Sequence, residues 1–169
     1  MSGAGTAPPM SEGCAYVIGP GGLARLHDKD AEAWTGLLRV HRRLMRELEA
    51  AQQDRYGLAL SALELLGRLA DAEEQRMRIA RLAEQTGLSL SRTSRVIDSL
   101  EQRGLLARER CPEDSRASNV QLTRAGLRLA REAQAAHLAD LQRLFFDRLT
   151  QRQISTLAAA FARLAPKPR

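Results

Sequence analysis

Aromatic residues make up only 4% of the 169-residue chain, and lysine and cysteine occur twice each. With so few aromatic and β-branched residues, the core must be built mainly from Leu, Ala, Ile and Val, which favours helices. Two cysteines are too few for a secreted fold held by disulfides. No hydrophobic run is long enough to span a bilayer, and no signal-peptide pattern is present at the N-terminus. We therefore expect a cytoplasmic protein that does not contact a membrane.

The positive charge is concentrated in one part of the chain. The formal net charge is +6; residues 28–75 carry a net charge of −3, whereas residues 76–131 hold twelve arginines and carry +6. Arginine's planar group suits phosphates and guanine edges better than lysine does. A genome-wide arginine bias explains the scarcity of lysine but not this regional asymmetry. The charge pattern therefore favours a middle segment that binds a polyanion.

Long helical patterns flank this middle segment. Residues 1–27 are rich in Gly, Pro and Ala and predict a flexible tail, and 166–169 form a short C-terminal tail. A helix is expected over residues 28–54 and another over 123–147. Capping boxes are expected at Ser61–Glu64, before a second helix, and at Thr150–Gln153, before the last one.

The terminal helices carry more apolar surface than a small core needs, which predicts a homodimer with interlaced ends. Residues 28–57 and 123–165 are the expected dimerisation helices, and a monomeric helical bundle is the alternative. The predicted apolar face of the helix over 123–147 comprises Leu127, Ala130, Gln134, His137, Leu138, Leu141, Leu144 and Phe145. The expected dimer interface comprises Leu37, Leu138, Leu141, Phe145, Leu157 and Phe161.

Residues 78–104 have the pattern of a helix-turn-helix. Gly87 ends a short helix in the left-handed conformation, Ser89 caps the next, and Gly104 stops it. The second helix, 90–103, is expected to point Thr93, Val96, Ile97 and Leu100 inward. Its first turns must approach base edges, so bulky apolar side chains are not expected there. The expected DNA-contacting residues of this helix are Ser89, Ser91, Arg92, Ser94 and Arg95.

Two strand patterns follow, at 105–110 and 118–122, joined by a connection over 111–117 that is longer than an ordinary hairpin loop. Such a hairpin fits a DNA-binding wing. Arg116 is expected to enter the minor groove, and Asp114 to hold its guanidinium extended. Arg108 and Arg110 are the other expected DNA contacts of the wing. A solvated Asp–Arg pair is the alternative for 114 and 116.

The segments Arg78–Ala83, Leu88–Ser89, Ser91–Leu100, Gly104–Leu105, Asp114–Arg116 and Val120–Gly126 resemble the MarR family of winged helix-turn-helix regulators. The resemblance covers roughly residues 30–165. It implies a mainly α fold: a DNA-binding winged helix over 58–122 with a two-stranded wing, inside a domain over 28–165 that dimerises through its terminal helices. It also implies a repressor that releases double-stranded DNA when a small effector binds between the dimer interface and the DNA-binding segment.

Candidate sensors are few. Trp34, His41 and Tyr56 could line an effector cleft, although such residues are more often dimer core. The three histidines lack metal-ligand spacing, so no metal and no other cofactor are expected. Cys111 lies beside Arg110, which would lower its thiol pKa, so a redox-sensing regulator is one alternative; Cys14 lies in the tail. The other alternative is a helical protein-interaction module without specific DNA binding. No catalytic constellation is present, so no enzyme is expected.

Overall fold

In the computed structural model, the backbone is described for residues 16–111 and 114–164, and side chains are described for these residues except 110–118. The chain divides into two compact units, Met1–Met45 and Arg46–Arg169. Helix α1 (Asp28–Tyr56) begins in the first unit and ends in the second. Each unit is described separately below.

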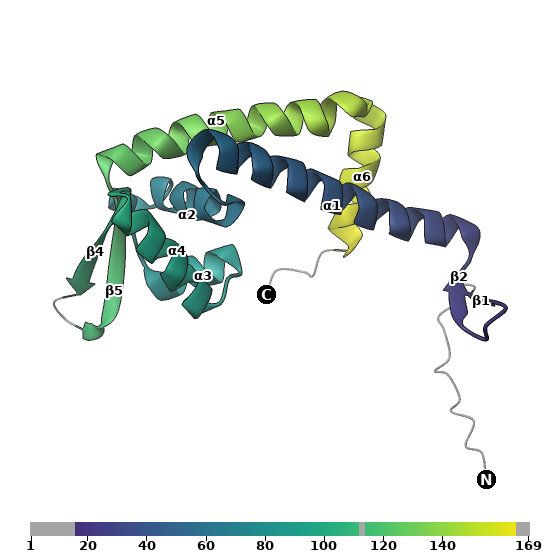
Figure 1. Ribbon diagram of the computed structural model, residues 1–169, viewed down its shortest axis with the longest axis horizontal. Coiled ribbons are helices and arrows are strands. Elements are labelled where there is room, and N and C mark those ends of the chain that lie inside the picture. The colour runs from purple at the N-terminus through teal and green to yellow at the C-terminus, as the bar shows by residue number, and fades with distance from the viewer. Residues whose placement is uncertain (1–15, 112–113, 165–169) are drawn as a thin grey trace, which may run out of the picture. The chain divides into compact units, whose positions relative to one another are not determined.

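The first unit contains a hairpin that precedes α1 (Figure 1). Strands β1 (Tyr16–Ile18) and β2 (Ala24–Leu26) pair antiparallel, with Tyr16 opposite Leu26. Gly22 has a φ of +74°, which the tight turn between the strands requires. The flexible tail predicted for residues 1–27 is therefore wrong for 16–26. The composition of the whole segment concealed a short Tyr-Val-Ile run followed by turn residues.

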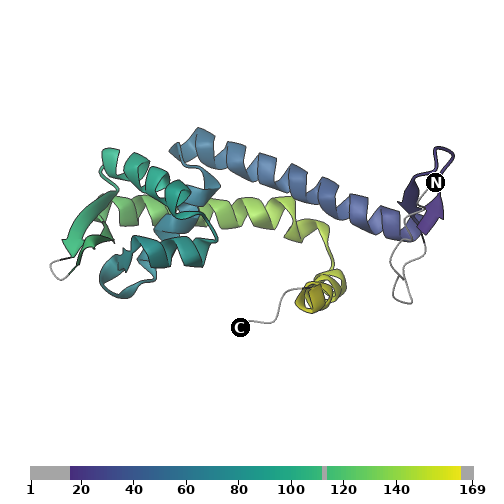
Figure 2. The ribbon, with the colours of Figure 1, turned by 90° about the horizontal axis from the view of Figure 1, so that it is seen from below.

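The second unit packs its helices around a leucine core. Helix α2 (Leu60–Ala70) lies against α5 (Arg124–Leu144), as Figures 1 and 2 both show. Leu65, Leu66 and Leu69 of α2 are fully buried. Aliphatic side chains of residues 78–122 complete this core, among them Leu82, Ile97, Leu100 and Val120. The mainly helical fold expected from the composition is confirmed.

The start of α2 differs from the expected capping box. Ser61 lies inside the helix, and Ala59 occupies the N-cap position without a capping side chain. The backbone N–H of Leu60 instead donates to Oε2 of Glu49, on α1, at 3.0 Å. A carboxylate at a helix N-terminus accepts from an otherwise free N–H group and interacts favourably with the helix dipole. Tertiary structure has thus supplied the cap that the local sequence lacks.

The helix-turn-helix is confirmed at each of its signals. Helix α3 (Ile79–Thr86) ends at Gly87, whose φ is +66°. Helix α4 (Leu90–Gln102) is capped by Ser89, whose hydroxyl accepts from the N–H of Arg92, and Gly104 follows the helix at φ +68°. Thr93, Ile97 and Leu100 are buried as expected, and Val96 is half-buried.

The sheet has one strand more than expected. Strands β3 (Arg76–Arg78), β4 (Leu106–Cys111) and β5 (Asp114–Leu122) form an antiparallel sheet in the order β3-β5-β4. β3 was missed because its three residues include one apolar side chain, Met77, which lies opposite Val120. Strands β4 and β5 form the expected two-stranded wing, beside α4 in Figure 2.

The connection expected over residues 111–117 is largely strand. Pairing is regular from Leu106–Leu122 to Arg110–Ser118, and then shifts so that Cys111 pairs with Asp114. Residues 115–117 therefore belong to β5 without entering this regular register. The wing is extended by an irregular ladder rather than by a long loop.

Helix α5 begins at its predicted N-cap, where Oγ1 of Thr123 accepts from the N–H of Gly126 at 3.0 Å. It ends at Leu144, three residues before the predicted Asp147, and a 3₁₀ turn over Phe146–Arg148 follows. Its buried stripe is also shifted: Ala133 and Asp140 are buried, whereas Gln134 and Leu138 are exposed.

Helix α6 (Gln151–Leu164) starts with the predicted capping box. The N–H of Thr150 donates to Oε1 of Gln153 at 2.9 Å, and the N–H of Gln153 donates back to Oγ1 of Thr150 at 3.4 Å. None of the residues of this helix is fully buried within the chain. An amphipathic helix that buries none of its residues has apolar surface left for another partner.

Candidate nucleic-acid interface

The exposed side of α4 carries most of the expected DNA-contacting residues of this helix. Ser91, Arg92 and Arg95 are exposed, and Ser94 is half-buried. Nη2 of Arg95 lies 3.5 Å from Oγ of Ser91, one helical turn earlier, so its guanidinium leans towards the start of the helix. The opposite face is fixed in the core, and this side of the helix therefore projects rigidly.

Ser89 has a structural role at this end. Its hydroxyl oxygen lies 3.3 Å from the N–H of Arg92, which it caps. Capping occupies a lone pair of the oxygen and leaves the hydroxyl proton available for a further acceptor. Ser89 was predicted as a DNA contact, and that role stays a prediction.

Leu90 contradicts the expectation that bulky apolar groups are absent from the first turn. It is the first residue of α4, and 55% of its surface is exposed. The sequence pattern missed it because Leu at a helix start is ordinarily assigned to the core.

Arg108 lies in a network that joins the wing to α4. Its guanidinium pairs with Asp98 and, at 3.6 Å, with Glu101. Its backbone N–H also donates to Oε1 of Glu101 at 3.1 Å. Two carboxylates therefore pair with the guanidinium that was predicted to contact DNA. These contacts hold β4 against α4.

The other wing residues lie partly outside the description. The backbones of Arg110, Cys111, Asp114 and Arg116 belong to β4 and β5. Their side chains are outside the described part of the chain. The minor-groove role of Arg116, its support by Asp114 and the redox role of Cys111 stay predictions, and Cys14 is also outside the described residues.

Arg103 holds the base of the interface and was missed from the sequence. Nη1 and Nη2 of Arg103 donate to the carbonyl oxygens of Gly57 and Tyr56, at 2.7 and 2.9 Å. A cation at the C-terminus of α1 satisfies free carbonyls and complements the helix dipole. The partners are 46 and 47 residues apart, so no local pattern signals the contact.

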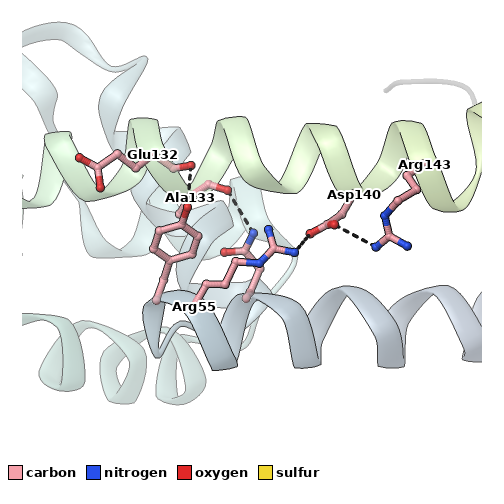
Figure 3. A network of polar contacts seen from close by, with 7 residues as sticks. Arg55, Glu132, Ala133, Asp140 and Arg143 are labelled. Carbon is pink, nitrogen blue, oxygen red and sulfur yellow. Dashed lines mark hydrogen bonds and ion pairs between the residues drawn. The ribbon is translucent and has the colours of Figure 1, made fainter.

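A polar cluster joins the last turns of α1 to α5 (Figure 3). Asp140 is 5% exposed and accepts from Arg55 at 2.7 Å and from Arg143 at 3.1 Å. Burial acts to raise the pKa of Asp140, but the hydrogen bonds and charges of the two arginines outweigh it and lower that pKa. Nε2 of Gln52, itself 1% exposed, donates to the carbonyl of Ala133 at 3.1 Å.

His137 lies on α5, one turn before Asp140. Burial lowers the pKa of His137, and the Asp140 charge opposes that change. The buried Nδ1 of His137 and Oε1 of Gln52 have no hydrogen-bond partner among the described residues.

The expected effector residues are divided between the two units, and their role stays a prediction. Trp34, 53% exposed, and His41 belong to the first unit. Tyr56 belongs to the second, where its hydroxyl donates to the carbonyl of Glu132 at 3.3 Å. In the second unit, a cavity of about 680 Å³ lies between α2 and α5. It is lined in part by Leu63, Leu127 and Leu138.

The predicted dimer residues retain exposed surface. Leu37, Leu138 and Phe161 are exposed, at 41%, 55% and 45%, and Leu141, Phe145 and Leu157 are half-buried. Within the described residues, no group of three or more His, Cys, Asp or Glu side chains is placed to hold a metal ion. No described helix combines the length and the apolar character that crossing a membrane requires.

The chain is similar to proteins of one regulatory family. The family model described as "MarR family" matches residues 56–117. AbsC, a MarR family transcriptional regulator from Streptomyces coelicolor, is 34% identical with a TM-score of 0.76, over 83% of this chain and 94% of AbsC. Sco3205, a MarR family transcriptional regulator from the same organism solved in complex with DNA, is 27% identical with the same TM-score, over 83% of this chain and 88% of Sco3205.

A MarR mutant from E. coli complexed with operator DNA is 19% identical, with a TM-score of 0.69, over 82% of this chain and 96% of that chain, and shows likeness of fold only. No curated protein sequence matches the chain. The similarity with AbsC extends over nearly the whole of that regulator, and the residues matched by the family model include α3, α4 and β4. The chain belongs to the MarR family of winged helix-turn-helix transcriptional regulators.

Proposed function

We propose that the protein is a sequence-specific DNA-binding regulator that acts as a homodimer on a palindromic operator. The observation that carries this function is the exposed row of Ser91, Arg92 and Arg95 on a helix whose other face is locked into the core. Arginine binds guanine O6 and N7 bidentately, and short hydroxyls reach phosphates or base edges. The DNA complex of Sco3205 supports the assignment by similarity.

The proposed dimer predicts the spacing of the operator half-sites. Two copies of α4 one DNA turn apart, at about 34 Å, would fill successive major grooves, so operator half-sites should lie about 10 bp apart. Arg116 of each wing would then enter the flanking minor groove, steadied by Asp114. These roles extend the interface beyond α4.

Repression relieved by a small effector completes the proposal. The cavity of about 680 Å³ between α2 and α5 has the volume of a small-molecule site. It borders α5 at Leu138, a predicted dimer residue. The lining combines leucines with charged side chains such as Arg68 and Arg131. A small ligand bound there would contact α5, the helix that leads from the wing to the predicted interface. The cleft predicted around Trp34, His41 and Tyr56 is the alternative site.

The DNA-binding function is tested by measuring the affinity of variants for a duplex selected from a random-sequence library. Arg92→Ala and Arg95→Ala should each weaken binding at least about tenfold. Arg152→Ala, an exposed arginine on α6, is the matched control and should leave affinity unchanged. If no sequence is enriched over random DNA, the protein is a helical interaction module instead.

A further inference from the structure

Leu90 is the one large hydrophobic side chain that is exposed among the described residues of the segment 58–122. The other large hydrophobic residues exposed in the described chain lie in the β1–β2 hairpin, in α1, or from Leu138 onward. Those elements belong to or adjoin the expected dimer helices. Leu90 instead stands at the tip of the DNA-binding helix, in a region that otherwise keeps its large apolar side chains inside.

The exposed residues that follow Leu90 in the first two turns of α4 are polar. They are Ser91, Arg92 and Arg95, and none of them is acidic. The first acid of the helix is Asp98, whose carboxylate is paired with Arg108. Leu90 is not required by the core, because Thr93, Ile97 and Leu100 occupy the buried face.

Among base edges, the major groove offers an apolar group at thymine, whose C5-methyl group projects into it. The first residues of a recognition helix are those that approach base edges. An exposed leucine at the first position of this helix therefore matches a thymine methyl group. We propose that Leu90 is a specificity-determining residue that contacts the 5-methyl group of one thymine in each operator half-site. This inference rests on the proposed DNA-binding function and names one of its base contacts.

The experiment replaces thymine by uracil, which removes the methyl group and keeps the base-pairing edge. The duplex is the site selected from the random library, with each symmetry-related pair of thymines replaced in turn. Binding of wild type, Leu90→Ala and Leu23→Ala is measured on every duplex. Leu23 is a 71% exposed leucine of the hairpin and serves as the matched control.

Loss of one buried methyl group weakens binding about fourfold, so replacement in both half-sites should cost wild type about 15-fold at one thymine pair. Leu90→Ala should bind the thymine and uracil forms of that duplex equally, and Leu23→Ala should keep the wild-type ratio. Because the readout is a ratio of two affinities, a general change in stability or dimerisation does not imitate it.

Two results overturn the inference while leaving the DNA-binding function intact: no thymine pair affects wild-type affinity, or the methyl effect persists undiminished in Leu90→Ala. The second result would assign the methyl contact to another residue. Failure to select any site from the library would instead overturn the proposed function, and this inference with it.

Discussion

Gly126 shows how closely α5 approaches the wing. A Cβ atom at this position would lie 2.1 Å from the carbonyl oxygen of Leu105 and 3.0 Å from Cδ1 of Leu122. The Leu105 carbonyl also accepts from the N–H of Thr123 at 3.1 Å, so it cannot move away freely. Glycine is needed here for space, and not for an unusual backbone conformation.

Gly126→Ala should therefore lower the free energy of unfolding by about 1–3 kcal/mol through overpacking. Gly67→Ala is the matched control, because Gly67 is also helical and its added Cβ would meet nothing within 4 Å. That control should raise stability by up to about 1 kcal/mol, since alanine favours the helix. Urea unfolding at one fixed protein concentration measures both. Equal effects of the two substitutions would contradict the steric argument.

At the scale of elements, single polar side chains hold neighbours together. Arg103 joins α4 to the end of α1, Asp140 joins α5 to α1, and Arg108 joins β4 to α4. The first two contacts link residues 47 and 85 positions apart, and the third links two neighbouring elements. The helices and the wing are thereby fixed as a frame around the exposed side of α4.

Asp140→Asn should destabilise the protein at pH 7 by about 1.5–3 kcal/mol, because it removes a buried charged acceptor of two arginines. The pKa of Asp140 is lowered in the fold, so its contribution is fully present above the unfolded pKa and is lost as pH falls through the folded one. The gap between wild type and variant should therefore narrow in acid. Glu64→Gln, which removes an exposed ion pair with Arg68, should change stability by less than about 1 kcal/mol. A gap independent of pH would contradict the assignment.

Arg108→Ala should leave the salt dependence of DNA binding unchanged. Its charge already faces Asp98 and Glu101, so we expect it to neutralise no phosphate and to release no counterion from the DNA. Arg92→Ala should reduce the slope of log affinity against log salt by about one unit for each phosphate that the variant no longer neutralises. Titrations at several salt concentrations distinguish the two. An equal reduction of the slope in Arg108→Ala would restore the DNA-binding role predicted from the sequence.

On the scale of the whole molecule, contacts within one chain do not explain the stability of α6. Its Ile154, Leu157 and Phe161 lie on one side, yet none of them is fully buried. An isolated helix of 14 residues is marginal in water unless its apolar side is packed. A second copy of the chain is the partner that the proposed dimer supplies.

The double variant Leu157→Asp, Phe161→Asp should therefore convert the dimer into monomer, because it places charges on the apolar side of α6. Sedimentation equilibrium measures the assembly state. Arg152→Asp, on the opposite side of the helix, should leave the dimer intact. A wild-type protein that sediments as a monomer, or a double variant that remains dimeric, would contradict the proposed interface.

Contacts close in sequence explain which features could be predicted. Gly87, Ser89 and Gly104 act on backbone within a few residues of themselves, and so do Thr123 and Thr150. The helix-turn-helix and the terminal helices could therefore be derived from local spacing. β3 could not be predicted, because a three-residue strand is stabilised mainly by its partner β5.

Local patterns in the chain were enough to predict the helical fold class, the position of α4 and the arginines that α4 exposes, because periodicity and caps act within a few turns. Which arginines stay exposed and which ones hold neighbouring elements together depends on the tertiary structure. Arg92 and Arg95 stay exposed, whereas Arg103 and Arg108 are bound to groups on other elements. Tertiary structure also gave α2 its cap from Glu49 and left Leu90 in solvent. Ion pairs, distant caps and burial depend on which elements pack against each other. Local sequence patterns do not specify these contacts.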